Sequence, residues 1–143
     1  MQTKQRKFQS DPKPNYHNSF LTSGTRAYII QKAMRVLLVQ PEQGTSFGIS
    51  KIVTTEPLGL ESIASPMLLD GHEVRIIDLR LEKPPRLSEE LRKFSPQAVG
   101  ISCSFTTDVY PTLKIAAHVK SHNQDNFVFV GGHHASLLPT DLL

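Results

Sequence analysis

The sequence predicts an α/β fold of the Rossmann-like or flavodoxin-like type, in which a parallel sheet carries helices on both faces. Short apolar runs typical of buried strands alternate along the chain with segments of helical spacing. The clearest run, 127–130, leads directly into Gly131-Gly132, as expected of a strand that is buried on both faces and ends in a tight loop. Ligands of open α/β sheets bind at the carboxyl ends of the strands, so this loop lies where we expect a functional site.

Residues 1–33 differ in composition from the rest of the chain. They hold six basic residues against one acidic residue, and few aliphatic side chains. We expect a disordered basic leader here, because such a segment buries too little apolar surface to offset the loss of chain entropy. The domain then spans 34–143, and Met34 is a candidate for the true start of the protein. Since the excess positive charge lies in the leader, no nucleic-acid partner is expected.

The elements of this domain are expected in the order of a parallel sheet with right-handed crossovers. After a first strand, apolar residues at helical spacing predict a helix between Pro57 and Gly71, and we expect Pro66 to kink it. The alternation continues to a last helix that begins near residue 137. The predicted strands are 35–40, 74–79, 98–102 and 127–131, and the predicted helices between the later strands are 88–94 and 110–122.

Four strands are few for this fold, and the last predicted helix is short. We therefore expect a domain that is truncated at its C-terminus. In a flavodoxin-like strand order, the strand 127–131 would then form an exposed edge of the sheet. Edge strands pair readily with other chains, so we expect self-association through this edge.

Several function classes lack their sequence signatures. The first strand is not followed by Gly-x-Gly-x-x-Gly, and no P-loop pattern occurs. Gln40 and Ser102 stand where a response regulator would carry a phosphoacceptor aspartate. The single cysteine, Cys103, permits neither an internal disulfide nor a cysteine metal cluster. No apolar run reaches the length of a membrane span and no secretory signal is present, so we expect a cytoplasmic protein.

Four sequence segments occur in an order that resembles the N-terminal cobalamin-binding domain of cobalamin-dependent radical S-adenosylmethionine (radical SAM) enzymes. They are 57–60 (Pro-Leu-Gly-Leu), 71–78 (Gly-His-Glu-Val-Arg-Ile-Ile-Asp), 99–102 (Val-Gly-Ile-Ser) and 130–135 (Val-Gly-Gly-His-His-Ala). The resemblance covers roughly residues 35–143. Within that family, segments 56–61 and 127–132 are similar to the hopanoid-methylase branch.

The resemblance implies that the loops after the first, third and fourth strands, 41–56, 102–107 and 131–136, hold the corrin ring and its nucleotide tail. Small hydroxyl side chains could hydrogen-bond the cofactor, and the double glycine could leave room for the tail. The alternative is that the hydroxyls only end a strand and the glycines only form a tight turn. The expected cofactor-binding residues are Thr54, Glu56, Pro57, Leu58, Ser102, Cys103, Ser104, Phe105, Thr106, Gly131, Gly132, His133, His134 and Ala135.

No catalytic residue or metal ligand is assigned. Other cobalamin domains carry Asp-x-His-x-x-Gly after the first strand, and this chain does not. His72 precedes the second strand, at the end of the sheet away from the site, and is expected to be a solvated turn residue. His133 and His134 lie at the correct edge, where either could contact the cofactor or simply belong to a polar loop. Cys103 is expected to be a small buried residue.

The resemblance implies a cobalamin-binding module of a methyltransferase-type enzyme, with a radical SAM catalytic domain or subunit as partner. With one cysteine, the chain cannot supply the Cys-x3-Cys-x2-Cys ligands of that family's iron–sulfur cluster, so no such cluster is expected in this chain. It would be a fragment, a split-gene product or a stand-alone subunit. One alternative is a flavodoxin-like regulatory or interaction domain that binds no cobalamin. Another is a small α/β enzyme with His133 or His134 as general base, although no carboxylate partner is evident beside them.

Overall fold

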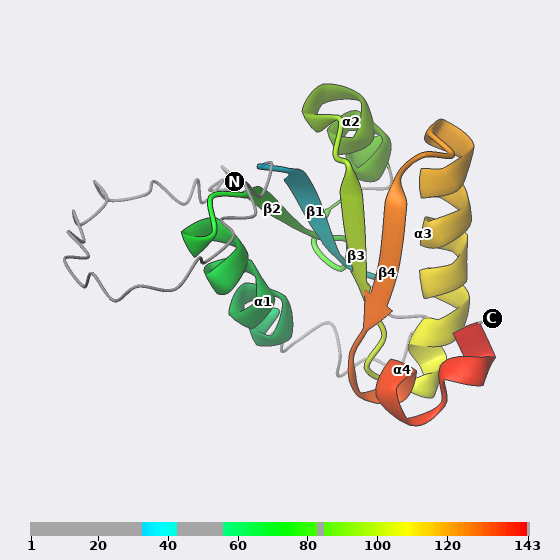
Figure 1. Ribbon diagram of the computed structural model, residues 1–143. Coiled ribbons are helices and arrows are strands. Elements are labelled where there is room, and N and C mark those ends of the chain that lie inside the picture. Colours follow the sequence, from blue (N-terminus) through cyan, green and yellow to red (C-terminus); the bar gives the residue numbers. More distant parts are fainter. Residues whose placement is uncertain (1–32, 43–55, 83–84, 143) are drawn as a thin grey trace, which may run out of the picture. The chain divides into compact units, whose positions relative to one another are not determined.

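The computed structural model describes residues 33–42, 56–82 and 85–142, so the expected leader and most of the loop after the first strand lie outside the described residues. The described chain forms a sheet of four parallel strands in the order β2-β1-β3-β4 (Figure 1), which confirms the predicted fold class. The strands are β1 (Arg35–Gln40), β2 (Glu73–Asp78), β3 (Ala98–Ser102) and β4 (Phe127–Gly131). The helices are α1 (Leu58–Leu69), α2 (Pro85–Phe94), α3 (Val109–His122) and α4 (His133–Leu137), with short 3-10 turns η1 (Thr106–Asp108) and η2 (Pro139–Leu142).

Strand β1 lies between β2 and β3 and forms the centre of the sheet. Val36 pairs with Val74 of β2 on one side and with Ala98 of β3 on the other. The four residues 36–39 are almost completely buried, with at most 2% of their surface exposed. A strand buried on both faces needs a continuous apolar run rather than an alternating one, and Val-Leu-Leu-Val supplies it.

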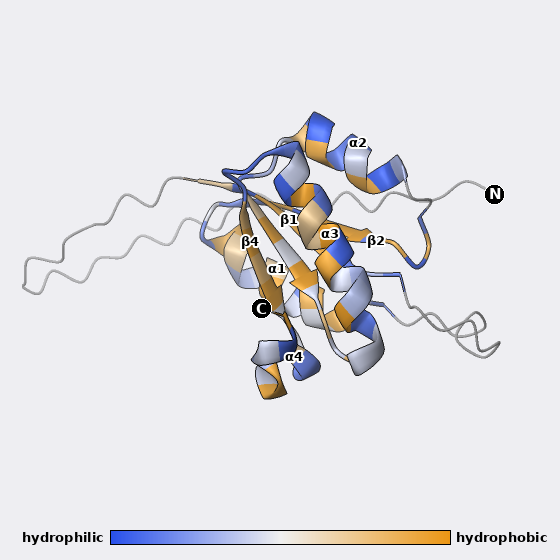
Figure 2. Cartoon of the chain, turned by 90° about the vertical axis from the view of Figure 1, so that its right-hand side faces the viewer, coloured by the Kyte–Doolittle hydropathy of each residue, from blue (hydrophilic) through white to orange (hydrophobic). Residues whose placement is uncertain are grey.

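Alternate residues of the strands supply two separate cores, because successive strand side chains point to opposite faces. Leu37 and Val39 of β1 pack with side chains of α2 and α3, among them Leu91 and Val119. Val36 and Leu38 point the other way and pack with Leu60 and Ala64 of α1. Helices α2 and α3 thus cover one face of the sheet, which we call the α3 face, and α1 covers part of the other, the α1 face. Figure 2 shows the strands as the most hydrophobic elements, with hydrophilic residues along the outside of α2.

Strand β2 begins and ends one residue before its predicted bounds, and α3 begins one residue early. Two larger differences have local reasons. Helix α2 begins at Pro85 rather than 88, because a proline fits the first helical turn, where no backbone donor is needed. The predicted helix from 137 onward is wrong: α4 instead ends at Leu137 and η2 follows. Pro139 restricts the residue before it, and Leu138 has the non-helical angles φ −132° and ψ 63°. Helix α1 continues past Pro66 to Leu69.

Strand β4 is an edge strand, because β3 is its one neighbour among the described strands. Its sequence, Phe-Val-Phe-Val-Gly, contains no charged residue and no proline, so it lacks the features that usually prevent edge strands from pairing. Phe127 at its start is 66% exposed.

We predict that the isolated chain self-associates through β4. The variant Phe127→Lys should shift it toward the monomer, because a charged residue on an edge strand opposes pairing with a second copy. Analytical ultracentrifugation over a concentration series checks this, with Leu69→Lys, at an exposed apolar residue of α1, as the matched control. A wild-type chain that stays monomeric at high concentration contradicts the prediction.

Candidate functional site

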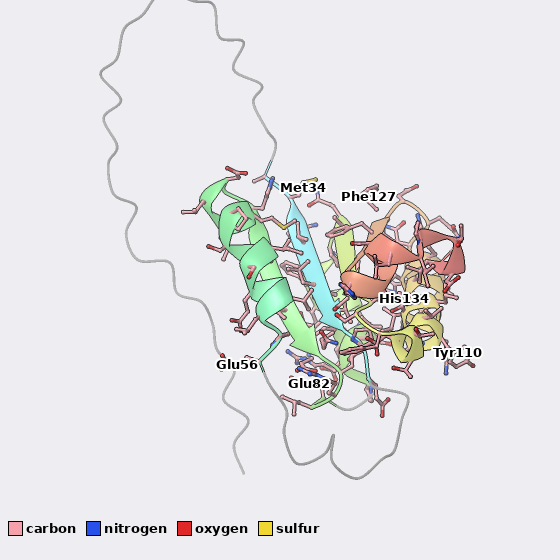
Figure 3. All side chains as sticks on the ribbon, turned by 90° about the horizontal axis from the view of Figure 1, so that it is seen from below. Met34, Glu56, Glu82, Tyr110, Phe127 and His134 are labelled. Carbon is pink, nitrogen blue, oxygen red and sulfur yellow. The ribbon has the colours of Figure 1, made fainter. Side chains whose placement is uncertain are left out.

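The residues expected to bind a ligand meet where β3 and β4 end, at the carboxyl edge of the sheet. Ser102 pairs with Gly131 in the strand register. One residue further on, the N–H of Cys103 donates to the carbonyl of Gly131 over 2.7 Å. The loop after β3 and the turn after β4 therefore leave the sheet side by side. Figure 3 looks onto this edge, with His134 near its centre.

The loop after β3 is held by a buried carboxylate that the sequence analysis missed. One oxygen of Asp108 accepts hydrogen bonds from the backbone N–H groups of Ser104, at 3.1 Å, and Phe105, at 3.0 Å. The residue is 2% exposed, and its other oxygen, Oδ1, has no hydrogen-bond partner among the described residues. The sequence signal that could have found it is an aspartate at the third position after a helix N-cap, here Asp108 after Phe105, where a carboxylate can accept hydrogen bonds from free backbone N–H groups. Its bonds fix the loop while Phe105 remains 62% exposed.

Two serine hydroxyls stand at the end of β3. The Oγ atoms of Ser102 and Ser104 are 3.4 Å apart, and both residues are half-buried. The hydroxyl of Thr112 in α3 donates to the carbonyl of Ser102. Each serine hydroxyl can both donate and accept, so the pair can hydrogen-bond a polar ligand that reaches the edge.

The two glycines have different roles. A Cβ atom added to Gly131 would meet no atom within 4 Å, so backbone here is open to close approach by a ligand. A Cβ on Gly132 would lie 2.6 Å from the carbonyl oxygen of Cys103, and Gly132 has φ +118°. The protein's own backbone therefore requires Gly132 to be glycine, and the open space belongs to Gly131. Gly132 thus forms the tight turn, and Gly131 leaves open space beside the sheet.

His134 begins the chain's return from β4 and is 5% exposed. Its Nδ1 lies 3.4 Å from the hydroxyl of Thr106, and its Nε2 lies 3.1 Å from a carboxylate oxygen of Asp141 in η2. No carboxylate partner for the histidines was evident in the sequence, and the structure supplies one, Asp141. Both ring nitrogens are engaged within the protein, so His134 links the β3 loop to η2, while the neighbouring His133 is exposed.

Cys103 is fully buried beside this link, as the sequence analysis predicted. Burial raises the pKa of its thiol, a hydrogen bond with Thr112 opposes the rise, and the nearby charges of Asp108 and Asp141 add to it. A raised thiol pKa keeps the group protonated at neutral pH, where it is a poor nucleophile. Cys103 thus packs the edge and does not offer a reactive thiolate.

The remaining predicted residues fall in three places. Ala135 is half-buried, and its N–H donates to the Cys103 carbonyl at 3.4 Å. Glu56, Pro57 and Leu58 lead into α1 at the same edge, on the other side from His134 (Figure 3), and Leu58 is 65% exposed. Thr54 lies outside the described residues.

His72 lies at the opposite end of the sheet, as predicted. Its Nδ1 accepts a hydrogen bond from the N–H of Met34, just before β1, at 3.2 Å. The same carboxyl edge as the site holds a charged pair that was not predicted: Arg80 donates to Asp78 at 2.6 Å, and this bond raises the pKa of Arg80.

Within the described residues, no group of three or more His, Cys, Asp or Glu side chains could hold a metal ion. No helix among them is long and apolar enough to cross a membrane.

A family model for the B12 binding domain matches residues 52–143. The chain belongs to the B12 binding domain family. This B12 binding domain is 38% identical over 88 residues to hopanoid C-3 methylase of Methylococcus capsulatus, a match that covers 62% of this chain and 17% of the relative. It is 36% identical over 112 residues to an uncharacterized methyltransferase of Pyrococcus horikoshii, covering 76% of this chain and 24% of the relative.

Solved structures share the fold of this B12 binding domain. The radical S-adenosylmethionine methyltransferase TsrM of Kitasatospora setae, with tryptophan substrate and an S-adenosylmethionine analogue bound, superposes with a TM-score of 0.63 at 23% identity. A second TsrM structure, with cobalamin and a 4Fe–4S cluster bound, gives a TM-score of 0.51 at 21% identity. Each match covers 75% of this chain and 21% of TsrM. The chain thus corresponds to a fraction of its relatives' length, and it is similar to the cobalamin-binding part of radical SAM methyltransferases.

The two glycines give a matched pair of stability predictions. Gly132→Ala should lower the free energy of unfolding by about 1–3 kcal/mol, because alanine is strained at this backbone angle and its Cβ meets the Cys103 carbonyl. Gly131→Ala should leave the unfolding free energy nearly unchanged, because its Cβ enters open space. Urea denaturation followed by circular dichroism measures both. Equal stability of the two variants would contradict the assignment of roles.

The Cys103 thiol should react with Ellman's reagent far more slowly in the folded protein than in urea-unfolded protein at pH 7, because it is buried and its pKa is raised. Because the thiol of the unfolded chain ionises at a lower pH than the buried thiol of the folded chain, the free energy of unfolding should fall as the pH rises above the ordinary thiol pKa of about 8.5. A Cys103→Ser variant controls for the pH dependence of other groups. Rapid labelling of the folded protein at neutral pH would show that the site is open at Cys103.

Proposed function

We propose that this chain binds cobalamin at the carboxyl edge of its sheet and presents it to a radical SAM catalytic domain or subunit in a methyl-transfer reaction. The observation that carries the proposal is the open backbone at Gly131 beside the hydroxyls of Ser102 and Ser104, in a chain of the B12 binding domain family. The open space lets a bulky group approach the sheet. The hydroxyls can pair with the amide side chains that surround a corrin ring.

Each part of the edge has a role in holding the cofactor. Ser102 and Ser104 would hydrogen-bond polar groups of the corrin or its tail, and Gly131 would admit the tail. The exposed Phe105 would give the ring an apolar contact, with the loop kept in place by Asp108. Bound cobalamin would supply a cobalt centre that carries a methyl group. His134 would position Thr106 rather than touch cobalt, since both of its ring nitrogens are already paired.

Catalysis would require more than the region that matches the B12 binding domain family. The methylase and methyltransferase relatives are several times longer than the matched region, and the single cysteine, Cys103, is buried. We therefore propose that the iron–sulfur cluster and the substrate site belong to another domain or subunit, and that the protein works in the cytoplasm. The alternative function is a regulatory or interaction domain of the same fold that binds no cobalamin, so a test of corrinoid binding distinguishes the two hypotheses.

Titration of the purified chain with hydroxocobalamin, followed by visible absorbance, tests the proposal. Gly131→Val should weaken binding strongly, because a branched side chain would fill the open space at the edge. Ser102→Ala should weaken it by about 0.5–1.5 kcal/mol, the net contribution of one hydrogen bond. His72→Ala should bind as wild type does, because His72 lies at the opposite end of the sheet.

Circular dichroism confirms that each variant is folded before it is titrated. Wild-type protein that does not bind hydroxocobalamin would refute the proposal in favour of the regulatory reading. Normal binding by folded Gly131→Val, together with loss of binding in His72→Ala, would show that the cofactor binds at the opposite end of the sheet and refute the proposed site.

A further inference from the structure

Two exposed histidines lie one turn apart at the end of helix α3. His118 and His122 are four positions apart in this helix, and His122 is its last residue. Side chains at this spacing lie on the same face of a helix, with their Cβ atoms about 5–6 Å apart. The same spacing on a helix brings two histidines onto one zinc ion in metalloproteases. The pair is therefore suited to hold one metal ion between two imidazole rings.

The contacts of the two rings place both of them at the boundary between α2 and α3. The Nε2 atom of His118 lies 2.9 Å from the hydroxyl of Ser88 in α2. One turn further along α3, His122 lines an open cavity of about 280 Å³, together with Leu91 of α2 and Ser95, which follows α2. Both imidazoles thus border α2, from positions on successive turns of α3.

Ser88 is placed to orient the ring of His118. A neutral imidazole has one N–H donor and one acceptor nitrogen. When Nε2 donates to the Ser88 hydroxyl, the lone pair of Nδ1 is available, and Nδ1 has no hydrogen-bond partner within the described residues. A hydrogen bond from the opposite ring nitrogen is the usual way in which a metal-ligating histidine is held in position.

The cavity beside His122 holds one carboxylate and one guanidinium group. Asp125 and Arg35 both line it. The Nε atom of Arg35 donates to the carbonyls of Phe94 and Ser95, at 2.8 and 2.9 Å, so this cation is held by backbone carbonyls at the end of α2. The opposite charges of Asp125 and Arg35 cancel, and together they leave no net positive charge to repel a divalent ion.

We propose that His118 and His122 bind a divalent transition-metal ion such as Zn²⁺, at a site separate from the proposed cofactor edge. Imidazole ligands suit zinc, copper and nickel, whereas magnesium and calcium prefer oxygen ligands. Water molecules would complete the coordination, because within the described residues no group of three or more His, Cys, Asp or Glu side chains could hold a metal ion. The bound ion would clamp the last turn of α3, just before β4 begins.

Isothermal titration calorimetry of the whole chain, purified without a histidine tag and in the absence of corrinoid, tests this site. Zinc chloride should bind with one-to-one stoichiometry, and magnesium chloride should not bind. His118→Gln and His122→Gln should each lower the affinity for zinc at least about tenfold, since loss of even an outer-shell partner has an effect of that size. Ser88→Ala should weaken binding to a smaller extent. The matched control is His133→Gln, at an exposed histidine of the carboxyl edge, which should leave the affinity unchanged.

A second measurement is the thermal unfolding midpoint, followed by circular dichroism. Excess zinc should raise the midpoint of the wild-type protein, because a ligand that binds only the folded state stabilises it. It should not raise the midpoint of the double variant His118→Gln/His122→Gln, whose unfolding curve without zinc also shows that it is folded.

Absence of zinc binding to the wild-type protein would overturn the proposal, and so would unchanged zinc affinity in the double variant or equal affinity for zinc and magnesium. Tighter zinc binding by Ser88→Ala would show that the hydroxyl competes with the metal, and would overturn its orienting role. Because no corrinoid is present in these experiments, their failure is distinct from a failure of the proposed cobalamin function.

Discussion

The close backbone contact between β3 and β4 beyond their last paired residues is the constraint on which the rest of the site depends. The N–H of Cys103 donates to the Gly131 carbonyl, and the Cys103 carbonyl in turn faces Gly132 at a distance that admits no side chain. These contacts keep the two chain segments together after the sheet has ended. They place the serine hydroxyls, the open glycine and the His134 link on one edge.

Most of the fold could be predicted because β1, β3 and β4 each contain a continuous apolar run, whereas β2 alternates apolar with charged residues over its first half. The runs of β1, β3 and β4 have the predicted bounds, and they lie in the middle of the sheet or bury one face against α3. The C-terminal turn was harder to predict, because Leu137, Leu138 and Leu142 have a helical spacing that Pro139 interrupts. There, the restriction that Pro139 places on the backbone of Leu138 outweighed the helical spacing of the leucines.

That the loops after β3 and β4 meet at one edge of the sheet could be predicted from the sequence, but the connections between them could not. The carboxyl edge follows from strand order, which the alternation of strands and helices fixes. The pairing of His134 with Asp141 depends on how two short turns fold back, and neither has a periodic pattern. The two adjacent glycines look equivalent in the sequence, and the approach of Cys103 from another strand is what makes them different.

The buried Asp108 also bears on the entropy of ligand binding. Because its carboxylate holds the N–H groups of Ser104 and Phe105 in a closed turn at the start of α3, the loop has its final shape before any ligand arrives. Ordering a flexible loop on association costs free energy, and a loop that is already ordered avoids that cost. The turn after β3 is thus preorganised, and a ligand that binds there would not have to order Ser104 and Phe105.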